Sequence, residues 1–253
     1  MKNLIFIFFA LFSITLMAQE AAEEAPKDVI LQTVILEPEL ESLPQLMENL
    51  AAHNKKYHPE GTPYQATVFQ IATGPNIGKM VWMMGPLTWA DLDNRPSGDG
   101  HDEDWVTNVV SLLEDVDHGE YWKLDVESSK NPGAEQYKMY YIRYHEFDRT
   151  NGYRGNDAFD KIAETMKAID DAKHWAVYDN QFRQGVKTGR HMATVSGMNS
   201  WAEMEDNWKF RAKFKELHGN GAWDNFLRDM DAAITNSWDE IWVYNAKLSG
   251  REE

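Results

Sequence analysis

Polar residues that could hold a ligand are concentrated on the strands predicted in the second half of the chain. On the strand that begins near Tyr137, alternation places Tyr141, Arg143 and His145 on one face, while the even-numbered residues between them point to the other. Charged side chains on a sheet face that meets another layer are costly to bury unless they are paired. These residues therefore either line a wet pocket or form a paired structural network, and the sequence leaves both readings open.

Neighbouring segments extend this candidate set. The predicted strand from His174 to Gln184 carries Arg183, and His191 begins the next strand. Trp208 opens an inserted segment that could supply an apolar wall. We predict a ligand-binding site made by the following residues: Tyr141, Arg143, His145, Arg183, His191 and Trp208.

The sequence supports a bound cofactor less strongly than it supports a ligand-binding site. Heme would need an axial histidine in a roomy apolar pocket, and the second half offers four histidines outside any motif: His145, His174, His191 and His218. The loop from Asp91 to Asp104 is rich in oxygen ligands, but its spacing does not match an EF-hand. We therefore predict no metal ligand and no cofactor, with heme as the alternative.

Composition excludes several classes of function. The 253-residue chain has a formal net charge of −16, which disfavours nucleic acid and anionic membrane surfaces as partners. It has no cysteine, which excludes thiol chemistry and disulfides. It also lacks a nucleotide-binding phosphate loop, a Gly-x-Ser-x-Gly elbow and a His-Glu-x-x-His helix. A small apolar or aromatic ligand is the partner class that remains.

The N-terminus has the organisation of a cleaved export signal. Lys2 precedes an apolar run from Leu4 to Met17, and an acidic spacer follows Ala18-Gln19. We expect cleavage near that bond and a periplasmic or secreted mature protein that has no membrane segment after cleavage.

The remainder of the chain contains one pattern of elements twice. Gly74-Pro-Asn-Ile-Gly78 and Gly185-Val-Lys-Thr-Gly189 each precede an apolar run, and each run is followed by a Gly-x-x-x-Trp pattern that ends at Trp89 or Trp201. A repeat of this length indicates a duplicated small domain. Hydrophobic periodicity predicts the order βαββαβ in each half. In the first half, it predicts a helix from Trp105 to about Val116 that Gly119 ends.

Three tryptophan pairs match between the halves: Trp89 with Trp201, Trp105 with Trp223, and Trp122 with Trp242. Matched positions predict a shared structural task, which is packing helices against the sheet.

The βαββαβ order gives an antiparallel sheet with both helices on one face. The duplicated unit resembles the dimeric α/β-barrel superfamily in a fused form, and this resemblance implies an α+β fold of two tandem ferredoxin-like units that make a pseudo-twofold α/β barrel. Members of that superfamily include heme-degrading and quinone-forming monooxygenases and chlorite-dismutase-like heme enzymes. In most of them the ligand lies between sheet and helices or inside the barrel.

The predicted domain boundaries are a signal peptide (1–18), a spacer (19–28), a first unit (29–127), a linker (128–136), a second unit (137–247) with an inserted helix (208–217), and a tail (248–253). The function we predict is that of an exported small-molecule-binding protein. A cofactor-free or heme-dependent monooxygenase-like enzyme and a structural protein with a filled barrel are the alternatives. Whether the protein is an enzyme is left open.

Overall fold

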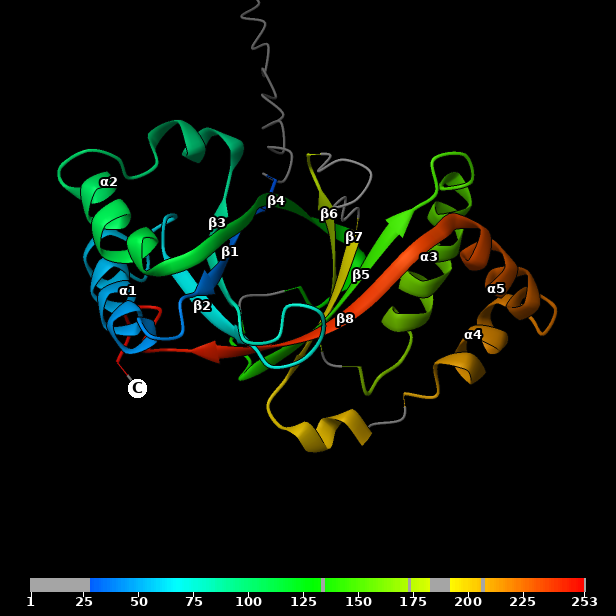
Figure 1. Cartoon of the computed structure of the whole chain (residues 1–253). Coiled ribbons are helices and arrows are strands. Elements are labelled where there is room, and N and C mark those ends of the chain that lie inside the picture. The colour runs from blue at the N-terminus through cyan, green and yellow to red at the C-terminus, as the bar shows by residue number, and fades with distance from the viewer. Residues whose placement is uncertain (1–27, 133–134, 173, 183–191, 206–207, 253) are drawn as a thin grey trace, which may run out of the picture.

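A computed structural model describes residues 28–132, 135–172, 174–182, 192–205 and 208–252. Its strands close into one barrel, in the cyclic order β1-β3-β2-β8-β5-β7-β6-β4, and every neighbouring pair is antiparallel (Figure 1). The strands are β1 (Ile30–Pro38), β2 (Ala66–Ile71), β3 (Met80–Leu87), β4 (Leu113–Lys130), β5 (Met139–Phe147), β6 (Trp175–Asn180), β7 (Met192–Met198) and β8 (Ile234–Asn245).

Helices cover the outside of the barrel on two opposite sides (Figure 1). On the first side they are α1 (Leu43–Tyr57) and α2 (His101–Asp104), and on the second they are α3 (Tyr153–Lys167), α4 (Phe210–His218) and α5 (Ala222–Ala233). The predicted inserted helix at 208–217 thus corresponds to α4. Among the described residues, none of the helices has the length and apolar character needed to cross a membrane.

The α+β class with an antiparallel sheet is confirmed. Each half contributes four consecutive neighbours in the ring, β4-β1-β3-β2 from the first and β8-β5-β7-β6 from the second. The halves meet at two seams, where β2 pairs with β8 and β4 pairs with β6. Closure leaves no sheet edge open, which removes the unpaired backbone groups of an edge strand.

The predicted helix from Trp105 to Val116 is wrong at its C-terminal end. After α2 the chain makes a π-helical turn (Trp105–Val109) and a short 3₁₀ turn, and β4 then begins at Leu113. Pairing with β1 decides this, because Leu113 lies opposite Pro38 and the ladder continues inward from there. Gly119 therefore lies within a strand instead of ending a helix. At its other end β4 runs to Lys130, into the segment 128–136 that we predicted as a linker.

The matched tryptophans have the predicted packing task only in part. Trp89 and Trp105 pack against the core of the first half, and Trp223 packs against Phe214 and Phe226 in the second. Trp89 and Trp201 each begin a 3₁₀ helix after the third strand of their half, but Trp201 is 52 % exposed and so is not a core residue. Trp122 and Trp242 are buried, and they lie inside the barrel instead of under helices. Each donates its indole N–H to a buried glutamate two residues earlier, Glu120 at 3.2 Å and Glu240 at 2.8 Å.

Candidate ligand-binding site

Strand β5 divides its side chains between two cavities, as its alternation predicts. Tyr140, Ile142 and Tyr144 face the interior of the barrel, and Tyr141 and Arg143 face outward with His145. The predicted separation of these residues into two faces is therefore confirmed by the structure.

The outward set lines a cavity of about 440 Å³ between the sheet and the helices of the second half. Strands β5, β6 and β7 form its floor, α3 and α5 form its walls, and Trp208 and Phe210 stand at the entry to α4. Most of the lining is apolar or aromatic, with the following members: Phe159, Ile162, Met166, Trp175, Met198, Met204, Trp208, Phe210, Phe226 and Met230.

Tyr141 and Arg143 form a closed network with Asp239 of β8, which lies directly opposite Arg143 in the sheet. Arg143 donates Nε–H to Asp239 Oδ1 at 2.7 Å and Nη2–H to Oδ2 at 2.9 Å, and the Tyr141 hydroxyl donates to Oδ2 at 2.6 Å. Burial and the bond to Asp239 raise the pKa of Tyr141 to about 12. Burial would raise the pKa of Asp239, but the bonds from Arg143 and Tyr141 outweigh it and lower that pKa. Arg143 and Asp239 therefore neutralise each other at this end of the cavity, which agrees with the reading of these residues as a paired structural network.

His145 is different because it is buried without a charge partner. It is 6 % exposed, its ring lies edge-on to Phe159 at 5.1 Å, and its Nδ1 has no hydrogen-bond partner among the described residues. Burial, reinforced by the nearby Arg143 charge, lowers its pKa to about 4. The ring is thus neutral at pH 7, and a buried ring nitrogen without a partner carries a desolvation cost of about 1–3 kcal/mol.

Four of the six predicted site residues, Tyr141, Arg143, His145 and Trp208, line this one cavity. Arg183 and His191 lie outside the described residues. His174, which we considered as a heme ligand, also lines the cavity, and its Nδ1 accepts the Gly197 backbone N–H at 3.2 Å.

Heme fits the described lining poorly. Because His174 Nδ1 is an acceptor, its neutral ring carries the proton on Nε2 and has no lone pair there for iron. The heme propionates would need cations, but Arg143 is already held by Asp239 and the other charged lining residues described are Asp171 and Glu203. Of the other described candidates, His145 lines the cavity with a neutral ring whose Nδ1 has no partner among the described residues, whereas His218 does not line it. The lack of a cation for the propionates is therefore what disfavours heme here.

A second cavity of about 440 Å³ occupies the barrel interior, and we did not predict it. Its lining is rich in aromatic side chains from both halves, the principal ones being Phe69, Trp122, Tyr140, Tyr144, Tyr178 and Trp242. Glu120-x-Trp122 and Glu240-x-Trp242 are the sequence signal for it, since the same Glu-x-Trp pattern occurs on the last strand of each half.

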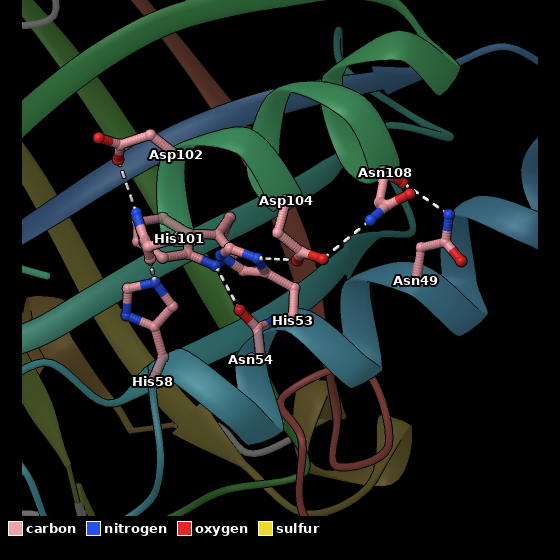
Figure 2. Close-up of polar contacts among 9 residues, drawn as sticks. Asn49, His53, Asn54, His58, His101, Asp102, Asp104 and Asn108 are labelled. Atoms are coloured by element: carbon pink, nitrogen blue, oxygen red, sulfur yellow. Dashed lines mark hydrogen bonds and ion pairs between the residues drawn. The ribbon is translucent and has the colours of Figure 1, made fainter. Parts of the chain in front are cut away.

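We also assigned no role to three histidines of the first half that the fold brings together. His53, His58 and His101 lie between α1 and α2, with ring centroids 5.1–5.4 Å apart (Figure 2). The pairing of His53 with His58 at the end of a predicted helix is a local signal, but the approach of His101 depends on the loop that precedes α2.

No family model matches the chain, and no curated protein matches it. Solved structures do match in fold. An anthrone oxidase-like protein gives a TM-score of 0.53 at 10 % identity over 87 % of this chain and 92 % of that one. A proposed monooxygenase from Lactobacillus acidophilus NCFM gives 0.52 at 10 % identity over 86 % and 94 %. A mutant chlorite dismutase from Candidatus Nitrospira defluvii gives 0.51 at 6 % identity over 87 % and 93 %. The chain therefore shares its fold with these solved structures, and their monooxygenase-like and chlorite-dismutase names agree with the resemblance drawn from its repeated element order.

Proposed function

We propose that the protein binds a small, largely apolar or aromatic molecule in the cavity between β5–β7 and helices α3 and α5. The observation that carries this proposal is the largely apolar cavity itself, which is lined by the buried, neutral ring of His145, whose Nδ1 has no hydrogen-bond partner among the described residues. Binding sites are typically apolar hollows with a few convergent polar groups. A ligand with one polar hydrogen, such as a phenol, would satisfy this nitrogen while its ring packs against Phe159 and Met166.

The monooxygenase-like alternative has the same cavity available, and it receives its support from the fold of the neighbours. A cofactor-free oxygenase needs a base that removes a proton from the substrate, and the best bases have a pKa near the working pH. His145, with its pKa lowered to about 4, is a weak base at neutral pH. At His145, this low basicity favours binding over removal of a proton from a substrate.

Mass spectrometry of small molecules extracted from protein purified from its native host tests the proposal. We expect a stoichiometric organic compound in wild-type protein and its loss in His145→Phe, which removes the ring nitrogens but keeps an aromatic side chain. Tyr178→Phe is the matched control, because it alters the barrel-interior cavity instead. Loss of the compound only in Tyr178→Phe would place the ligand inside the barrel and contradict the proposal. A wild-type protein without any bound compound would favour the structural alternative, and oxygen-dependent conversion of the compound would favour the enzyme.

We further propose that the chain is exported and cut near Ala18-Gln19, since an apolar run after Lys2 and a small residue at the cut support a signal peptide. N-terminal sequencing of the protein from the native host tests this, and retention of Met1 would contradict it.

We also infer that residues 29–127 and 137–247 are two ferredoxin-like copies. Their equal strand order and the two Glu-x-Trp contacts support this inference. Superposition of the two halves in an experimental structure is the test.

A further inference from the structure

The end of α1 and the start of α2 bring three histidines to one point, separate from both cavities. His53 lies on the buried side of α1, and His58 caps the C-terminal end of that helix, where its backbone N–H donates to Asn54 O at 2.9 Å. His101 is the first residue of α2 and follows Gly100, whose φ of +82° turns the loop back toward α1. One ring nitrogen from each histidine lies within 4.8 Å of the other two.

The outer nitrogen of each ring is held by an oxygen acceptor. His53 Nδ1 lies 2.7 Å from Asp104 Oδ2, and His101 Nδ1 lies 2.8 Å from Asp102 Oδ1 (Figure 2). His58 Nδ1 lies 2.9 Å from the Tyr64 carbonyl oxygen. Carbonyl and carboxylate oxygens only accept, so each Nδ1 carries the proton. In the neutral ring, Nε2 then keeps its lone pair, which is the tautomer of a metal-ligating histidine whose other nitrogen is held by a carboxylate or carbonyl.

Two of the inner nitrogens are at metal-ligand spacing, and the ligand atom of His53 lies within 4.8 Å of those of His58 and His101. His58 Nε2 and His101 Nε2 lie 3.2 Å apart. Two nitrogens bound to one tetrahedral metal at about 2.0–2.1 Å lie about 3.3 Å apart. His53 Nε2 is buried and has no hydrogen-bond partner among the described residues. A shared proton would join His58 to His101 but would leave the His53 nitrogen unsatisfied, whereas a cation satisfies all three.

We propose that His53, His58 and His101 bind one divalent transition-metal ion of the zinc class through their Nε2 atoms. Neutral imidazoles suit Zn²⁺, Cu²⁺ and Ni²⁺ better than Ca²⁺ or Mg²⁺, which prefer oxygen ligands. Three protein ligands leave a coordination position for water or an exogenous ligand, as in catalytic zinc sites and unlike closed structural ones.

The surroundings of the cluster fit this role. Asp104 and Asp102 place two carboxylates behind the rings, and their charges offset that of a dication. Asp104 is in turn held by Asn108 Nδ2 at 2.8 Å.

Aromatic rings enclose the cluster on several sides. Trp105 packs on His53 with ring centroids at 5.1 Å, Trp82 packs on His58 at 5.1 Å, and Tyr57 packs on His101 at 5.1 Å. Such packing fixes the ring orientations and limits the access of bulk water, which is the support that a metal site needs around its ligands.

Equilibrium dialysis of metal-stripped protein against Zn²⁺, with Co²⁺ absorption as a geometric probe, tests the site. We expect one Zn²⁺ per chain and a Co²⁺ spectrum of low coordination number. His101→Gln is the first variant, because its side chain is 15 % exposed and the variant should fold. It should weaken Zn²⁺ binding more than tenfold, and Asp104→Asn should weaken it about 10–100-fold by releasing His53.

His218→Gln is the matched control, since His218 is also near a carboxylate, with Nδ1 at 3.7 Å from Glu164, but lies in the second half. It should bind Zn²⁺ as tightly as wild type, and circular dichroism should show that all variants are folded. The proposal is overturned if wild-type protein binds none of Zn²⁺, Co²⁺ and Cu²⁺. Unchanged binding by folded His101→Gln, or an equal loss in His218→Gln, also overturns it.

Discussion

Asn54 joins the first helix to the C-terminal end of the chain, and its replacement should be among the costlier polar substitutions in this protein. It lies on α1, next to His53, and is fully buried. Its Nδ2–H donates to the Leu248 carbonyl at 2.7 Å, and its Oδ1 accepts the Trp82 indole N–H at 2.9 Å. Asn54→Ala would leave both of these partners buried and unpaired.

The size of the effect follows from these two groups. A buried donor or acceptor that loses its partner costs about 1–3 kcal/mol. Two such groups, partly relieved by local relaxation or water, predict a loss of about 2–4 kcal/mol in the free energy of unfolding. In a domain of this size, that corresponds to a fall in Tm of roughly 5–15 °C, at about 2–4 °C for each kcal/mol.

Urea denaturation followed by tryptophan fluorescence measures this loss. The matched control is Asn49→Ala, on the same helix, whose Nδ2–H also bonds a distant carbonyl, that of Asn108 at 2.8 Å, but from an exposed position. Water can replace that bond, so the control should lose less than about 1 kcal/mol. If the two variants lose equal stability, burial of the Asn54 amide is not what makes it important, and the reasoning fails.

Three further predictions follow from local geometry. Gly74→Ala should lower the free energy of unfolding, measured by denaturation, by about 2–4 kcal/mol, because φ is +92° and a Cβ would lie 2.3 Å from the Asp239 carbonyl oxygen. Gly78→Ala is the control: φ is +90° but nothing lies within 4 Å of its Cβ, so it should lose only about 1 kcal/mol. The pKa of His145 is lowered from 6.5 to about 4, so the neutral buried ring contributes fully to the free energy of unfolding above pH 6.5, and this contribution is lost as pH falls toward 4. His145→Gln removes the titrating group and should therefore flatten the stability–pH curve between pH 6.5 and 4 by up to about 3 kcal/mol. Arg143→Ala should lower the free energy of unfolding by only about 1 kcal/mol, because both partners of the pair with Asp239 are about two-fifths exposed, and a larger loss would show that the network carries the fold.

The strand and helix order was predictable because it depends on local periodicity. The alternation of Tyr141, Arg143 and His145 with their neighbours correctly divides β5 between two layers. The good helix formers of the inserted segment likewise predict a short helix there, and α4 (Phe210–His218) confirms it. Each of these features rests on residues close together in the chain, where the period of the pattern decides which side is buried.

The end of the helix after Trp105 was not predictable, because the apolar residues keep helical spacing as far as Val116. Pairing of β4 with β1 overrides this local pattern from Leu113 onward. The exposure of Trp201 is a similar case: its position after β7 repeats that of Trp89, but the packing around it does not.

By itself, the sequence determined the element order, the two faces of β5, the absence of thiol chemistry and the acidic surface. The tertiary structure alone decided which strands join the two halves of the barrel, that Asp239 holds Arg143, and that His101 joins His53 and His58. The physical reason is that these features depend on strand register and loop direction between segments far apart in the chain. Local periodicity predicts which face of its helix or strand a residue occupies, but it does not predict which distant residue it contacts on that face.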